Sequence, residues 1–562
     1  MWKKSEFNSI KAYVEHNTGM SEAELLNDTK NYRIQGLEKI RKRLLEAVKN
    51  HTHITCVGDY DVDGVSSMAI LSLLLKYLGA DYNIRIPKRF TEGYGLNMKI
   101  IDEITDGLML TADNGIAAVD QIKAAKAKGL EVIVTDHHLA RADGIIPEAD
   151  IIVAPEAFPE TSDFDGYCGA AICYKLAEPL VKDEKLLQHM KVLAGIATVA
   201  DVMPLIWDNR NIVKEMLSII TNKSENLRSG LKALLLKGKI ENPVTTDISF
   251  KIAPMLNACS RMFDEGAVLA YNALILDETE GIAFQSAKMA VDIDGINEMR
   301  KQKTLNCLAY VERQIVEENL TEHNPMVVYG PEIPPGIIGL VAGKLAEKYK
   351  RPAICFADGP NNLIKGSARN YVDYDIKALL DLIANKLVGY GGHKAAAGIT
   401  GERSRYQEIR QALWDKCDYE APENDDEYLL EIKSYEVAHI YQELVKYAPY
   451  GEHNPMPVFK IRDIHLLPDN SGQPFRIMAV RHIKFHSEFF NIVAFDFAEK
   501  YMAIKENPKM DENHIDTLYG TIGLNWYKGF ATLQIETTGI EFRKRCNEPT
   551  AFAKILRGAC NG

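Results

Sequence analysis

Short apolar runs alternate with longer segments of helical spacing in the first third of the chain. The short runs predict strands and the longer segments predict helices, and this alternation is typical of a mainly parallel sheet. The expected strands are residues 54–57, 82–87, 107–111 and 131–135, and the expected helices between them are residues 68–78 and 116–128.

The pattern predicts further helical and α/β parts around this sheet. Residues 21–50 have Leu and Ile at helical spacing among many charged residues, which predicts a covering helix. Residues 283–320 lack proline and contain one glycine, so we expect a long helix that bridges two domains. A second α/β unit follows, with strands at 326–329 and 353–356 and a helix at 336–349.

Beyond a polar, acidic linker at residues 421–427, the pattern changes to β-rich segments broken by Asn, Gly and Pro. These segments are residues 458–467, 475–486, 489–497, 518–525 and 529–536. Five strands of this kind favour an OB-fold. Aromatic side chains such as Phe475, Phe485 and Trp526 would then be available to stack on bases, although core packing is the commoner role of an aromatic residue.

Composition places the chain among ordinary globular proteins. Its 562 residues, 46% of them hydrophobic and 26% charged, are too many for one hydrophobic core. No window approaches the roughly 18 apolar residues of a membrane span, so we expect a cytoplasmic protein without a membrane partner. A net charge of −12 argues against broad electrostatic attachment to nucleic acid, so a polyanion would need a local groove or bound metals. The nine cysteines form no CxxC pair and no His/Cys cluster at zinc spacing, which argues against a structural zinc or a disulfide framework.

Three aspartates fall on alternate positions directly after the first expected strand: Asp59, Asp61 and Asp63. Carboxylates this close repel one another unless a cation lies among them, and Mg²⁺ or Mn²⁺ prefers oxygen ligands. An Asp-rich surface turn is the alternative, because turns favour Asp and Gly for backbone reasons. A calcium loop is excluded, since its closing Glu would fall at Ile70 inside an apolar helix.

Two more polar segments follow expected strands: residues 112–115 (ADNG) and residues 136–138 (DHH). Ligands of parallel sheets gather at the carboxyl ends of the strands, so Asp113 and His137 are expected beside the first aspartates. Asp201 is left exposed where a proline halts a later helical pattern. Mixed carboxylate and imidazole ligands suit manganese, and the sequence therefore predicts a metal centre.

Two glycine-rich segments of the second α/β unit carry basic residues: residues 366–370 (GSARN) and residues 389–398 (GYGGHKAAAG). Glycines allow a phosphate to approach the backbone, and Arg369, His393 and Lys394 offer positive charge. Tight turns and close helix packing also use glycine, so both interpretations stay open on this pattern alone.

Together these segments resemble the DHH phosphoesterase superfamily, and in detail its RecJ family of single-strand exonucleases. The four segments similar to the DHH motifs are residues 58–64 (GDYDVDG), 111–115 (TADNG), 135–138 (TDHH) and 200–201 (AD). Further segments that resemble RecJ are residues 92–96 (EGYGL), 168–171 (CGAA) and 252–262 (IAPMLNACSRM), and Gly391, Gly392 and His393 resemble the GGH motif of the DHH-associated domain. The chain departs from the family at Ala154, where Asn is common, and at Cys259 and Ser260, where Ala-Gly is usual.

The resemblance covers nearly the whole chain and implies an α/β protein of several domains. The implied domains are an N-terminal helical cover (1–50), a parallel-sheet DHH catalytic domain (51–282), a bridging helix (283–320), a second α/β DHH-associated domain that binds substrate (321–420), a C-terminal β-rich OB-fold that binds nucleic acid (428–545) and a tail (546–562).

The resemblance also implies roles for individual residues. Two manganese or magnesium ions are expected on Asp59, Asp61, Asp63, Asp113, His137 and Asp201, with Asp113 as the bridge. The implied catalytic group is Asp113, His137, His138 and Asp136, in which His138 hydrogen-bonds the scissile phosphate and Asp136 orients a ligand. The implied substrate-binding residues are Arg89, Tyr94, Asn257, Arg261, Ser367, Arg369, Gly391, Gly392 and His393.

The implied function is a metal-dependent 5′-to-3′ exonuclease that hydrolyses single-stranded DNA by a two-metal mechanism, in DNA repair or recombination. The protein is expected to be a monomer with single-stranded DNA as its partner. A helicase or a single-strand-binding protein is expected to supply this DNA. One alternative is a DHH-type phosphoesterase of oligonucleotides, cyclic dinucleotides or pyrophosphate, against which the OB-like region argues. The other is a non-catalytic DNA-binding scaffold, against which the retained metal ligands of all four motifs argue.

Overall fold

The computed structural model describes residues 2–28, 30–141, 143–277, 283–421, 426–469, 472–478, 481–527 and 529–545. The chain divides into two compact units. The larger holds residues 31–203 and 208–423, and the smaller holds residues 1–30, 204–207 and the chain from 424 onward. The expected tail at 546–562 and residues 422–425 of the expected linker lie outside the described residues.

A five-stranded parallel sheet forms the first part of the larger unit, with the strand order β3-β2-β4-β5-β6. Its strands are β2 (Ile54–Val57), β3 (Tyr82–Arg85), β4 (Leu108–Ala112), β5 (Glu131–Thr135) and β6 (Ile151–Val153). The four expected strands are confirmed. The fifth, β6, escaped prediction because three residues are too few to show a period.

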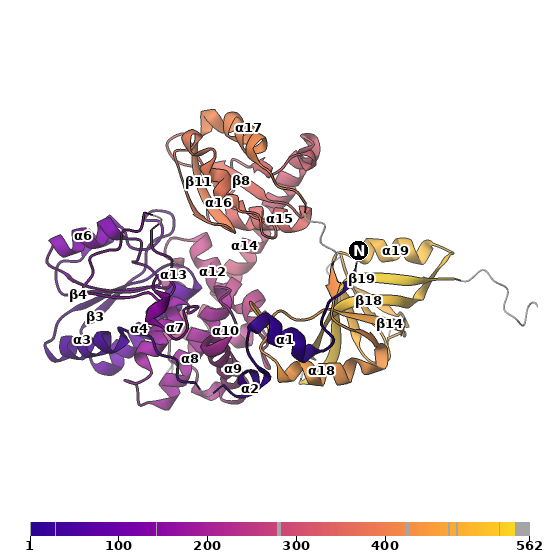
Figure 1. Ribbon diagram of the computed structural model, residues 1–562, viewed down its shortest axis with the longest axis horizontal. Helices are drawn as coiled ribbons and strands as arrows, with labels where there is room; N and C mark the ends of the chain where they lie inside the picture. The colour runs from indigo at the N-terminus through magenta and orange to yellow at the C-terminus, as the bar shows by residue number, and fades with distance from the viewer. Residues whose placement is uncertain are drawn as a thin grey trace, which may run out of the picture. The chain divides into compact units, whose positions relative to one another are not determined.

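Helices cover both faces of this sheet, as Figure 1 shows for α6 on one side and for α3 and α4 on the other. The helices around the sheet are α3 (Leu37–Lys49), α4 (Val62–Leu78), α5 (Met98–Glu103), α6 (Val119–Ala127) and α7 (Gly169–Ala177). Every residue of α4 from Val62 to Leu75 is buried, because α4 packs against α7, α8 and α13 as well as the sheet. This burial explains why α4 is apolar all round.

The single covering helix expected at residues 21–50 is wrong. The segment forms α2 (Glu22–Asn27) and α3, and Gly36 with a φ of 90° begins α3 after a break. A φ in this range favours glycine and cannot continue a right-handed helix, so the helical spacing does not extend through it. Only α3 packs against α7 and β6, whereas α2 and α1 (Ile10–Thr18) belong to the smaller unit.

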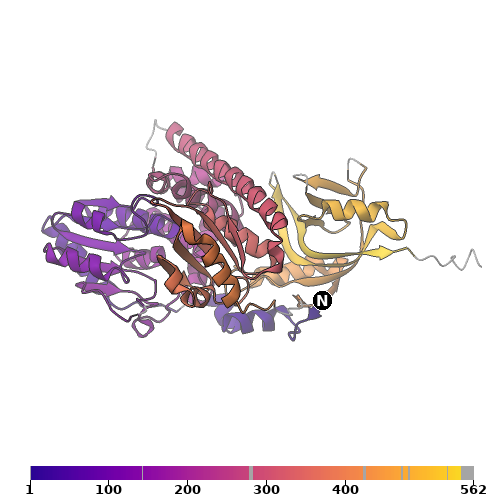
Figure 2. The same ribbon diagram turned by 90° about the horizontal axis from the view of Figure 1, so that it is seen from above.

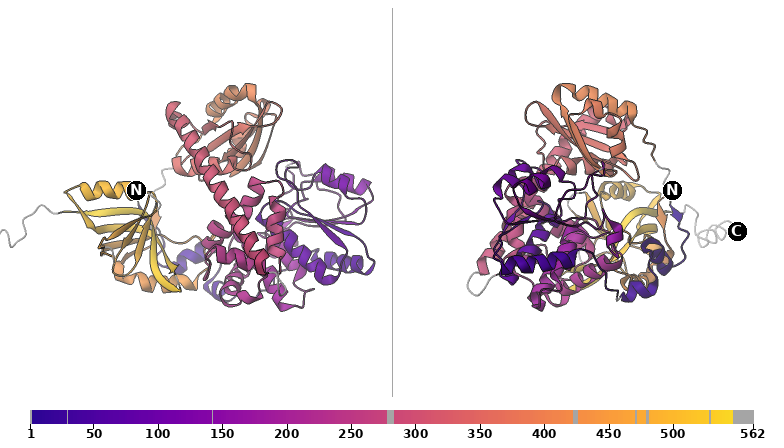
Figure 3. Two further views of the ribbon diagram at one scale, coloured as in Figure 1. Left: turned by 180° about the vertical axis from the view of Figure 1, so that it is seen from behind. Right: turned by 60° about the vertical axis from the view of Figure 1, so that its left-hand side comes forward.

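A helical region follows, and the long helix α14 runs from it to the second sheet (Figure 3). Its helices are α8 (Glu184–Ala200), α9 (Trp207–Asn222), α10 (Ser229–Lys237), α11 (Thr245–Asp247), α12 (Ala253–Met262), α13 (Gly266–Ile275) and α14 (Ala283–Glu317). Helix α14 packs on α10 and α12 near its start and on β7 and α15 near its end. The expected bridging helix is therefore confirmed.

The second sheet has the strand order β10-β11-β9-β8-β7, parallel between β7 and β8 and antiparallel elsewhere. Its strands are β7 (Met326–Tyr329), β8 (Ala353–Asp358), β9 (Leu363–Arg369), β10 (Gly389–His393) and β11 (Ala396–Glu402). Helix α15 (Ile338–Tyr349) packs on β8 and β9, while α16 (Ile376–Asp381) and α17 (Tyr406–Lys416) pack on β11. Both glycine-rich segments are thus parts of strands.

The smaller unit contains a seven-stranded sheet in the order β13-β14-β18-β19-β17-β16-β15. Its strands are β13 (Glu431–Lys433), β14 (Phe459–His465), β15 (Phe475–Met478), β16 (His482–His486), β17 (Asn491–Ala494), β18 (Met510–Tyr527) and β19 (Phe530–Lys544). Figure 2 shows β18 and β19 as a long antiparallel pair. Helices α18 (Val437–Lys446) and α19 (Ala498–Glu506) complete the unit, and strand β1 (Lys3–Lys4) pairs with β12 (Glu427–Tyr428).

Two details of this unit differ from expectation. The segment 475–486 is a hairpin of β15 and β16, not one strand, because the chain reverses within it. Phe485 is fully buried in the core and cannot stack on bases, whereas Trp526 is 41% exposed. No described helix of the protein combines the length and apolar character that crossing a bilayer requires.

Candidate metal centre and phosphate site

A tight turn after β2 brings three carboxylates to the carboxyl edge of the first sheet. Asp59 directly follows the turn's first glycine, Asp61 caps α4 by accepting from the Gly64 N–H at 3.1 Å, and Asp63 lies in the first turn of α4. A Cβ added at Gly64 would lie 2.5 Å from the Asp59 carbonyl oxygen. Only glycine allows this approach, so Gly64 is required for the three carboxylates to converge.

Asp113 joins them from the end of β4. Its φ of 61° is left-handed, and its backbone N–H donates to the Thr135 carbonyl at 3.1 Å on β5. Gly169, the first residue of α7, packs so closely that an added Cβ would lie 2.7 Å from the Asp113 Cβ. An aspartate tolerates a left-handed backbone better than most residues, so the chain can turn its carboxylate into the site.

His137 lies at the centre of the carboxylates. Its Nε2 atom is 3.1 Å from Asp113 Oδ1, 3.5 Å from Asp63 Oδ2 and 3.6 Å from Asp201 Oδ2. Asp201 reaches this point from the C-terminal cap of α8. A second group of ligand atoms within 4.8 Å of one another comes from Asp59, Asp61 and Asp113. Asp113 therefore belongs to both groups.

The electrostatics of this cluster favour a cation. Burial, and next the neighbouring carboxylates, raise the pKa values of Asp59, Asp61 and Asp113, and they raise the pKa of Asp201 to about 8. Burial lowers the pKa of His137, which keeps its imidazole neutral and its lone pair free for a metal. The Asp59 Oδ2 atom is buried and has no hydrogen-bond partner in the described protein. The donor set thus fits divalent cations with oxygen and nitrogen ligands.

Asp63 is fixed by the N-terminus of α7. Its two carboxylate oxygens accept from the backbone N–H groups of Gly169 at 2.6 Å and Ala170 at 2.7 Å. The positive end of a helix stabilises such a carboxylate. Each oxygen keeps a further lone pair, so Asp63 can be held by α7 and still face His137.

His138 forms a hydrogen-bonded chain beside the cluster. Its Nδ1 atom is 2.8 Å from Asp136 Oδ1, and its Nε2 atom is 3.0 Å from the Tyr94 hydroxyl. Burial lowers the pKa of His138, but the hydrogen bond to Asp136 and the negative charges of Asp136, Asp201 and Asp63 together outweigh burial and raise the pKa to about 9. The Asp136 Oδ1 atom also accepts from the His137 and His138 N–H groups. Asp136 therefore orients both histidines.

The expected substrate-binding arginines converge from three elements of the larger unit. Arg89, in the loop after β3, stacks over the Tyr60 ring at 4.5 Å. Burial, and next the charge of Arg89, lower the pKa values of Arg261 on α12 and Arg369 on β9, that of Arg261 to about 10. Arg261 donates to the Gly336 carbonyl at 3.2 Å, just before α15. Cations this close to one another make a site for an anion.

The strand register groups the other expected residues of the second sheet. Gly391 on β10 and Ser367 on β9 pair with the same residue of β11, and so do His393 and Arg369. Directly opposed residues share a face of the sheet, so Ser367, Arg369 and His393 lie on one face. The N-terminal turn of α15 lies there too, because a Cβ at Gly339 would meet Arg369 Nη2 at 2.7 Å.

Two expected residues lie less centrally in these contacts. Gly392 has a φ of 142° and pairs with Ala397, so its role is in the backbone of β10. Asn257 lies one turn before Arg261 on α12, and its Oδ1 atom is buried without a partner in the described protein. An unpaired buried amide oxygen is costly and suits a site that a ligand completes.

Three residues of the site were not predicted as site residues. Tyr60 supports Arg89 and contacts Tyr94 edge to face at 6.2 Å, Gly169 holds Asp63 and crowds Asp113, and Arg300 on α14 adds its charge beside Arg261. The position of Gly169 at the start of a helix was a usable signal. No sequence signal singles out Arg300 on its long helix.

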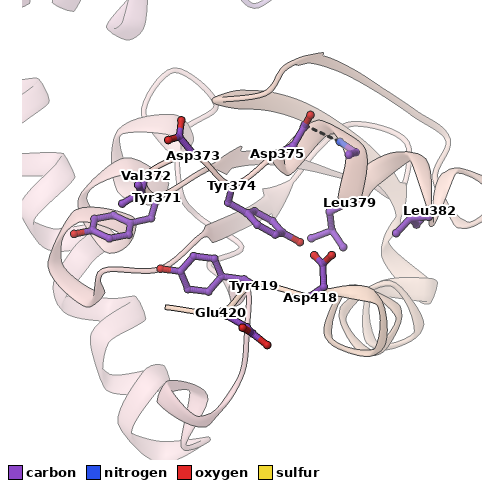
Figure 4. A pocket seen from close by; sticks show the side chains of 11 residues that line it. Tyr371, Val372, Asp373, Tyr374, Asp375, Leu379, Leu382, Asp418, Tyr419 and Glu420 are labelled. Atoms are coloured by element: carbon purple, nitrogen blue, oxygen red, sulfur yellow. Dashed lines mark hydrogen bonds between the residues drawn. The ribbon is translucent and has the colours of Figure 1, made fainter. Parts of the chain in front are cut away.

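A cavity of about 440 Å³ lies elsewhere, in the second α/β domain, and contains none of the expected site residues (Figure 4). It is lined by Tyr371, Val372, Asp373, Tyr374, Asp375, Ala378, Leu379, Leu382, Asp418, Tyr419 and Glu420. Four acidic side chains in its wall repel phosphate, so this cavity is not a nucleic-acid site.

Three family domains match the chain: DHH family, N-terminal domain, over residues 53–201, DHHA1 domain over residues 323–418, and RecJ OB domain over residues 430–538. The single-stranded-DNA-specific exonuclease RecJ of Haemophilus influenzae is 30% identical over 412 residues, which are 69% of each chain. The protein of the same name from Bacillus subtilis is 32% identical over 78% of this chain and 55% of its own length. The chain thus spans little more than half of that relative.

Two solved structures are similar. A crystal structure of exonuclease RecJ bound to manganese is 28% identical, with a TM-score of 0.59 over 69% of this chain and 96% of the other. RecJ from Thermus thermophilus, in complex with Mn²⁺, has a TM-score of 0.76 over 97% of this chain and 77% of the other. At 24% identity this second likeness shows that the two proteins share a fold.

Proposed function

The chain belongs to the RecJ family of DHH-domain proteins, and from this premise we propose that it is a metal-dependent exonuclease that hydrolyses single-stranded DNA from the 5′ end. The observation that carries the proposal is the buried cluster in which His137 Nε2 lies within 3.6 Å of three carboxylates at the carboxyl edge of a parallel sheet. The 5′ polarity and a role in DNA repair or recombination follow from the family alone.

Two divalent cations, manganese or magnesium, complete the proposed site. One group of ligands is Asp59, Asp61 and Asp113, and the other is Asp63, His137 and Asp201, with Asp113 between them. When bound, the cations supply a water nucleophile of lowered pKa and neutralise charge on the phosphate. The raised carboxylate pKa values support this assignment, because a bound cation offsets both the burial and the mutual repulsion that cause them.

His138 is the proposed hydrogen-bond donor to the scissile phosphate. With a pKa of about 9 it is charged at neutral pH, and Asp136 holds its Nδ1 atom. Its Nε2–H group then points to the Tyr94 hydroxyl. A phosphate oxygen that displaces this hydroxyl would accept a hydrogen bond from the Nε2–H group. Tyr94 would keep its contact with the Asp113 carbonyl.

The remaining phosphates are proposed to lie along the arginine cluster. Arg89, Arg261 and Arg369 supply charge, and Ser367, His393 and the N-terminus of α15 supply further donors. Gly391 and Gly392 lie on the edge strand β10 and have no side chain that would keep the DNA backbone from this edge of the sheet. The OB domain is proposed to hold the single strand that leads into the site.

We place the protein in the cytoplasm as a monomer that works on ends supplied by a helicase or a single-strand-binding protein. A short-substrate phosphoesterase would not need the OB domain, and a scaffold would not need the metal ligands. The proposed domain boundaries are those expected from the sequence, with residues 1–30 assigned to the OB-containing unit.

Digestion of end-labelled oligonucleotides tests the proposal. With Mn²⁺, a single strand labelled at its 3′ end should shorten from the other end, and the duplex and a chelator-treated sample should stay intact. Dinucleotides and pyrophosphate serve as competing substrates. Hydrolysis of these alone would favour the small-molecule phosphoesterase, and binding of single strands without any hydrolysis would favour the scaffold.

A further inference from the structure

A second cluster of metal-ligating side chains lies in the smaller unit and shares no residue with the sites described above. It consists of Asp463 and His465 on β14 and His514 on β18, whose ligand atoms all lie within 4.8 Å of one another. His465 and His514 are directly opposed on antiparallel strands, with ring centroids 4.0 Å apart. The His514 Nε2 atom is 2.8 Å from Asp463 Oδ1.

The backbone is shaped to bring Asp463 into this cluster. The register passes from the pair Arg462 and Thr517 to the pair Ile464 and Ile515, and Asp463 between them has a φ of 61°. A left-handed residue inside a strand costs free energy and is uncommon outside glycine. Here it turns the carboxylate onto the two imidazoles.

We propose that Asp463, His465 and His514 form a metal site that cross-links β14 and β18. The chemistry of these ligands favours zinc. Two imidazoles and one carboxylate suit Zn²⁺, which commonly takes three protein ligands and a water, and they suit it better than the oxygen-seeking Mg²⁺. His514 is 3% exposed and His465 is exposed, so the cluster is anchored on one side and open to an ion on the other.

Arg543 is the main competitor for Asp463. Its Nη2 atom lies 2.6 Å from Asp463 Oδ1 and 3.6 Å from Asp516 Oδ1. A metal-bound carboxylate is normally hydrogen-bonded by a neighbour, and Asp463 has a second oxygen for the ion, so Arg543 can stay as that neighbour.

Spacing rules could not find this site, because Asp463 and His514 are 51 positions apart and no cysteine takes part. The strand pairing brings them together. The site is also chemically distinct from the centre around His137, which is dominated by carboxylates.

Metal uptake by the full-length chain tests the proposal. The wild type, His465→Asn and the matched control His439→Asn, an exposed histidine on α18, are loaded with Zn²⁺ or Co²⁺, desalted and assayed for bound metal. We expect His465→Asn to retain one ion fewer than the wild type. Its affinity for zinc at the Asp463–His465–His514 site should fall by more than the roughly 10–100-fold seen when a residue that only hydrogen-bonds a metal ligand is removed. The control should match the wild type, and Mn²⁺-dependent DNA hydrolysis should be unchanged in all three.

Equal stoichiometry in the wild type and His465→Asn would overturn the proposal and leave a His514–Asp463–Arg543 ion-pair cluster. Because His465 is exposed, this variant should fold. Asp463→Asn is a second variant, and it should lose the same ion and the Zn²⁺-dependent rise in unfolding temperature. A zinc-dependent rise that persists in both variants contradicts the site as well.

Discussion

At the scale of single residues, Asp113 is the point where the two ligand groups meet, and the charges of neighbouring carboxylates act on it from both groups. We predict that Asp113→Asn lowers hydrolysis by at least about 10²–10³-fold, the cost of losing one well-placed electrostatic group. The fold should persist, because asparagine tolerates the left-handed φ of 61°. Nuclease assays and thermal unfolding with and without Mn²⁺ measure both effects.

The sign of the stability change identifies the cause. The pKa of Asp113 is higher in the folded than in the unfolded state. The protonated carboxyl therefore contributes its full stability below the unfolded-state pKa, and this contribution is lost as pH rises through the folded-state pKa. With a chelator at neutral pH, Asp113→Asn should therefore unfold at an equal or higher temperature than the wild type. With Mn²⁺ the order should reverse. A variant that is destabilised with chelator would show that Asp113 supports the fold instead.

Asp136 is expected to act through His138. We predict that Asp136→Asn lowers the pKa of His138 from about 9 toward the ordinary value of about 6.5, because its stabilising hydrogen bond to Nδ1 is weakened. NMR titration of the metal-free protein measures the pKa, and the alkaline limb of the pH–rate profile should move to lower pH. Asp150→Asn, in the same domain but paired with Lys126, is the control. An unmoved alkaline limb would remove His138 from the reaction.

The stability contribution of His138 has a defined pH window. Its folded pKa lies above its unfolded value, so the contribution is full below about pH 6.5 and is lost as pH rises through about 9. Asp136→Asn should flatten the dependence of unfolding temperature on pH in this window.

The sequence predicts that the proposed ligand residues gather at one edge of the sheet, but it does not predict the residues that support them. Asp59, Asp113 and His137 could be predicted because each follows a strand of a parallel sheet, and this rule needs no distances. Tyr60 and Arg300 could not, since an aromatic in a turn and an arginine on a helix are common everywhere. Their roles arise only from long-range packing.

At the scale of elements, the first turn of α7 positions two carboxylates of the metal centre: it hydrogen-bonds Asp63 and packs against Asp113. We predict that Gly169→Ala destabilises the protein by about 1–3 kcal/mol, because its Cβ would lie 2.7 Å from the Asp113 Cβ and something must shift. Hydrolysis should fall with it, since Asp63 and Asp113 move. Unfolding curves and single-turnover rates measure the two effects.

Gly295→Ala on α14 is the matched control. Nothing lies within 4 Å of the Cβ it would add, so it should stabilise the protein by about 0.5–1 kcal/mol. Similar behaviour of the two variants would show that the space beside Asp113 is not tight.

The row of residues across β9 and β10 leads to a prediction on binding. Arg369→Ala should weaken single-strand binding by about 1.5–3 kcal/mol, the value of a hydrogen bond to a charged group. Fluorescence titration in the Asp113→Asn background measures this loss without cleavage. Arg405→Ala removes an equal charge from an exposed pair with Glu408 and should have little effect. Equal losses in the two variants would point to general charge instead of a site.

Element boundaries were predictable where the local pattern decides them. The pattern predicts the strand at 131–135 correctly at both ends, whereas it predicts one strand over 475–486 because no glycine or proline inside the segment marks its hairpin. The pattern does not reveal the break at Gly36, because helical spacing continues across it.

At the scale of the whole molecule, the smaller unit joins distant parts of the sequence. Its core contains Ile10, Val14, Met20 and Leu25 together with residues beyond 428. No local pattern reveals this association, because each short helix is amphipathic by itself and does not specify its partner.

Because residues 1–30 share a core with the OB domain, a truncation that removes the OB domain should remove these residues as well. We predict that residues 31–423 form a folded protein that cleaves short single strands but captures long ones poorly, because stacking contributes roughly 1–3 kcal/mol per base. Residues 1–423 should be less soluble, since the apolar faces of α1 and α2 lose their core. Binding and processivity assays on strands of two lengths measure the effect. Full capture of long strands by the folded 31–423 protein would make the smaller unit a docking module.

The pairing of β1 with β12 has a further consequence for biosynthesis. Residues 1–30 leave the ribosome before the larger unit, yet their core partners begin at residue 424. At roughly 5–20 residues per second, α1 and α2 wait on the order of tens of seconds with apolar faces uncovered, while the larger unit emerges and folds. A nascent chain of this protein therefore exposes the apolar faces of α1 and α2 to chaperones until the segment from residue 424 has emerged.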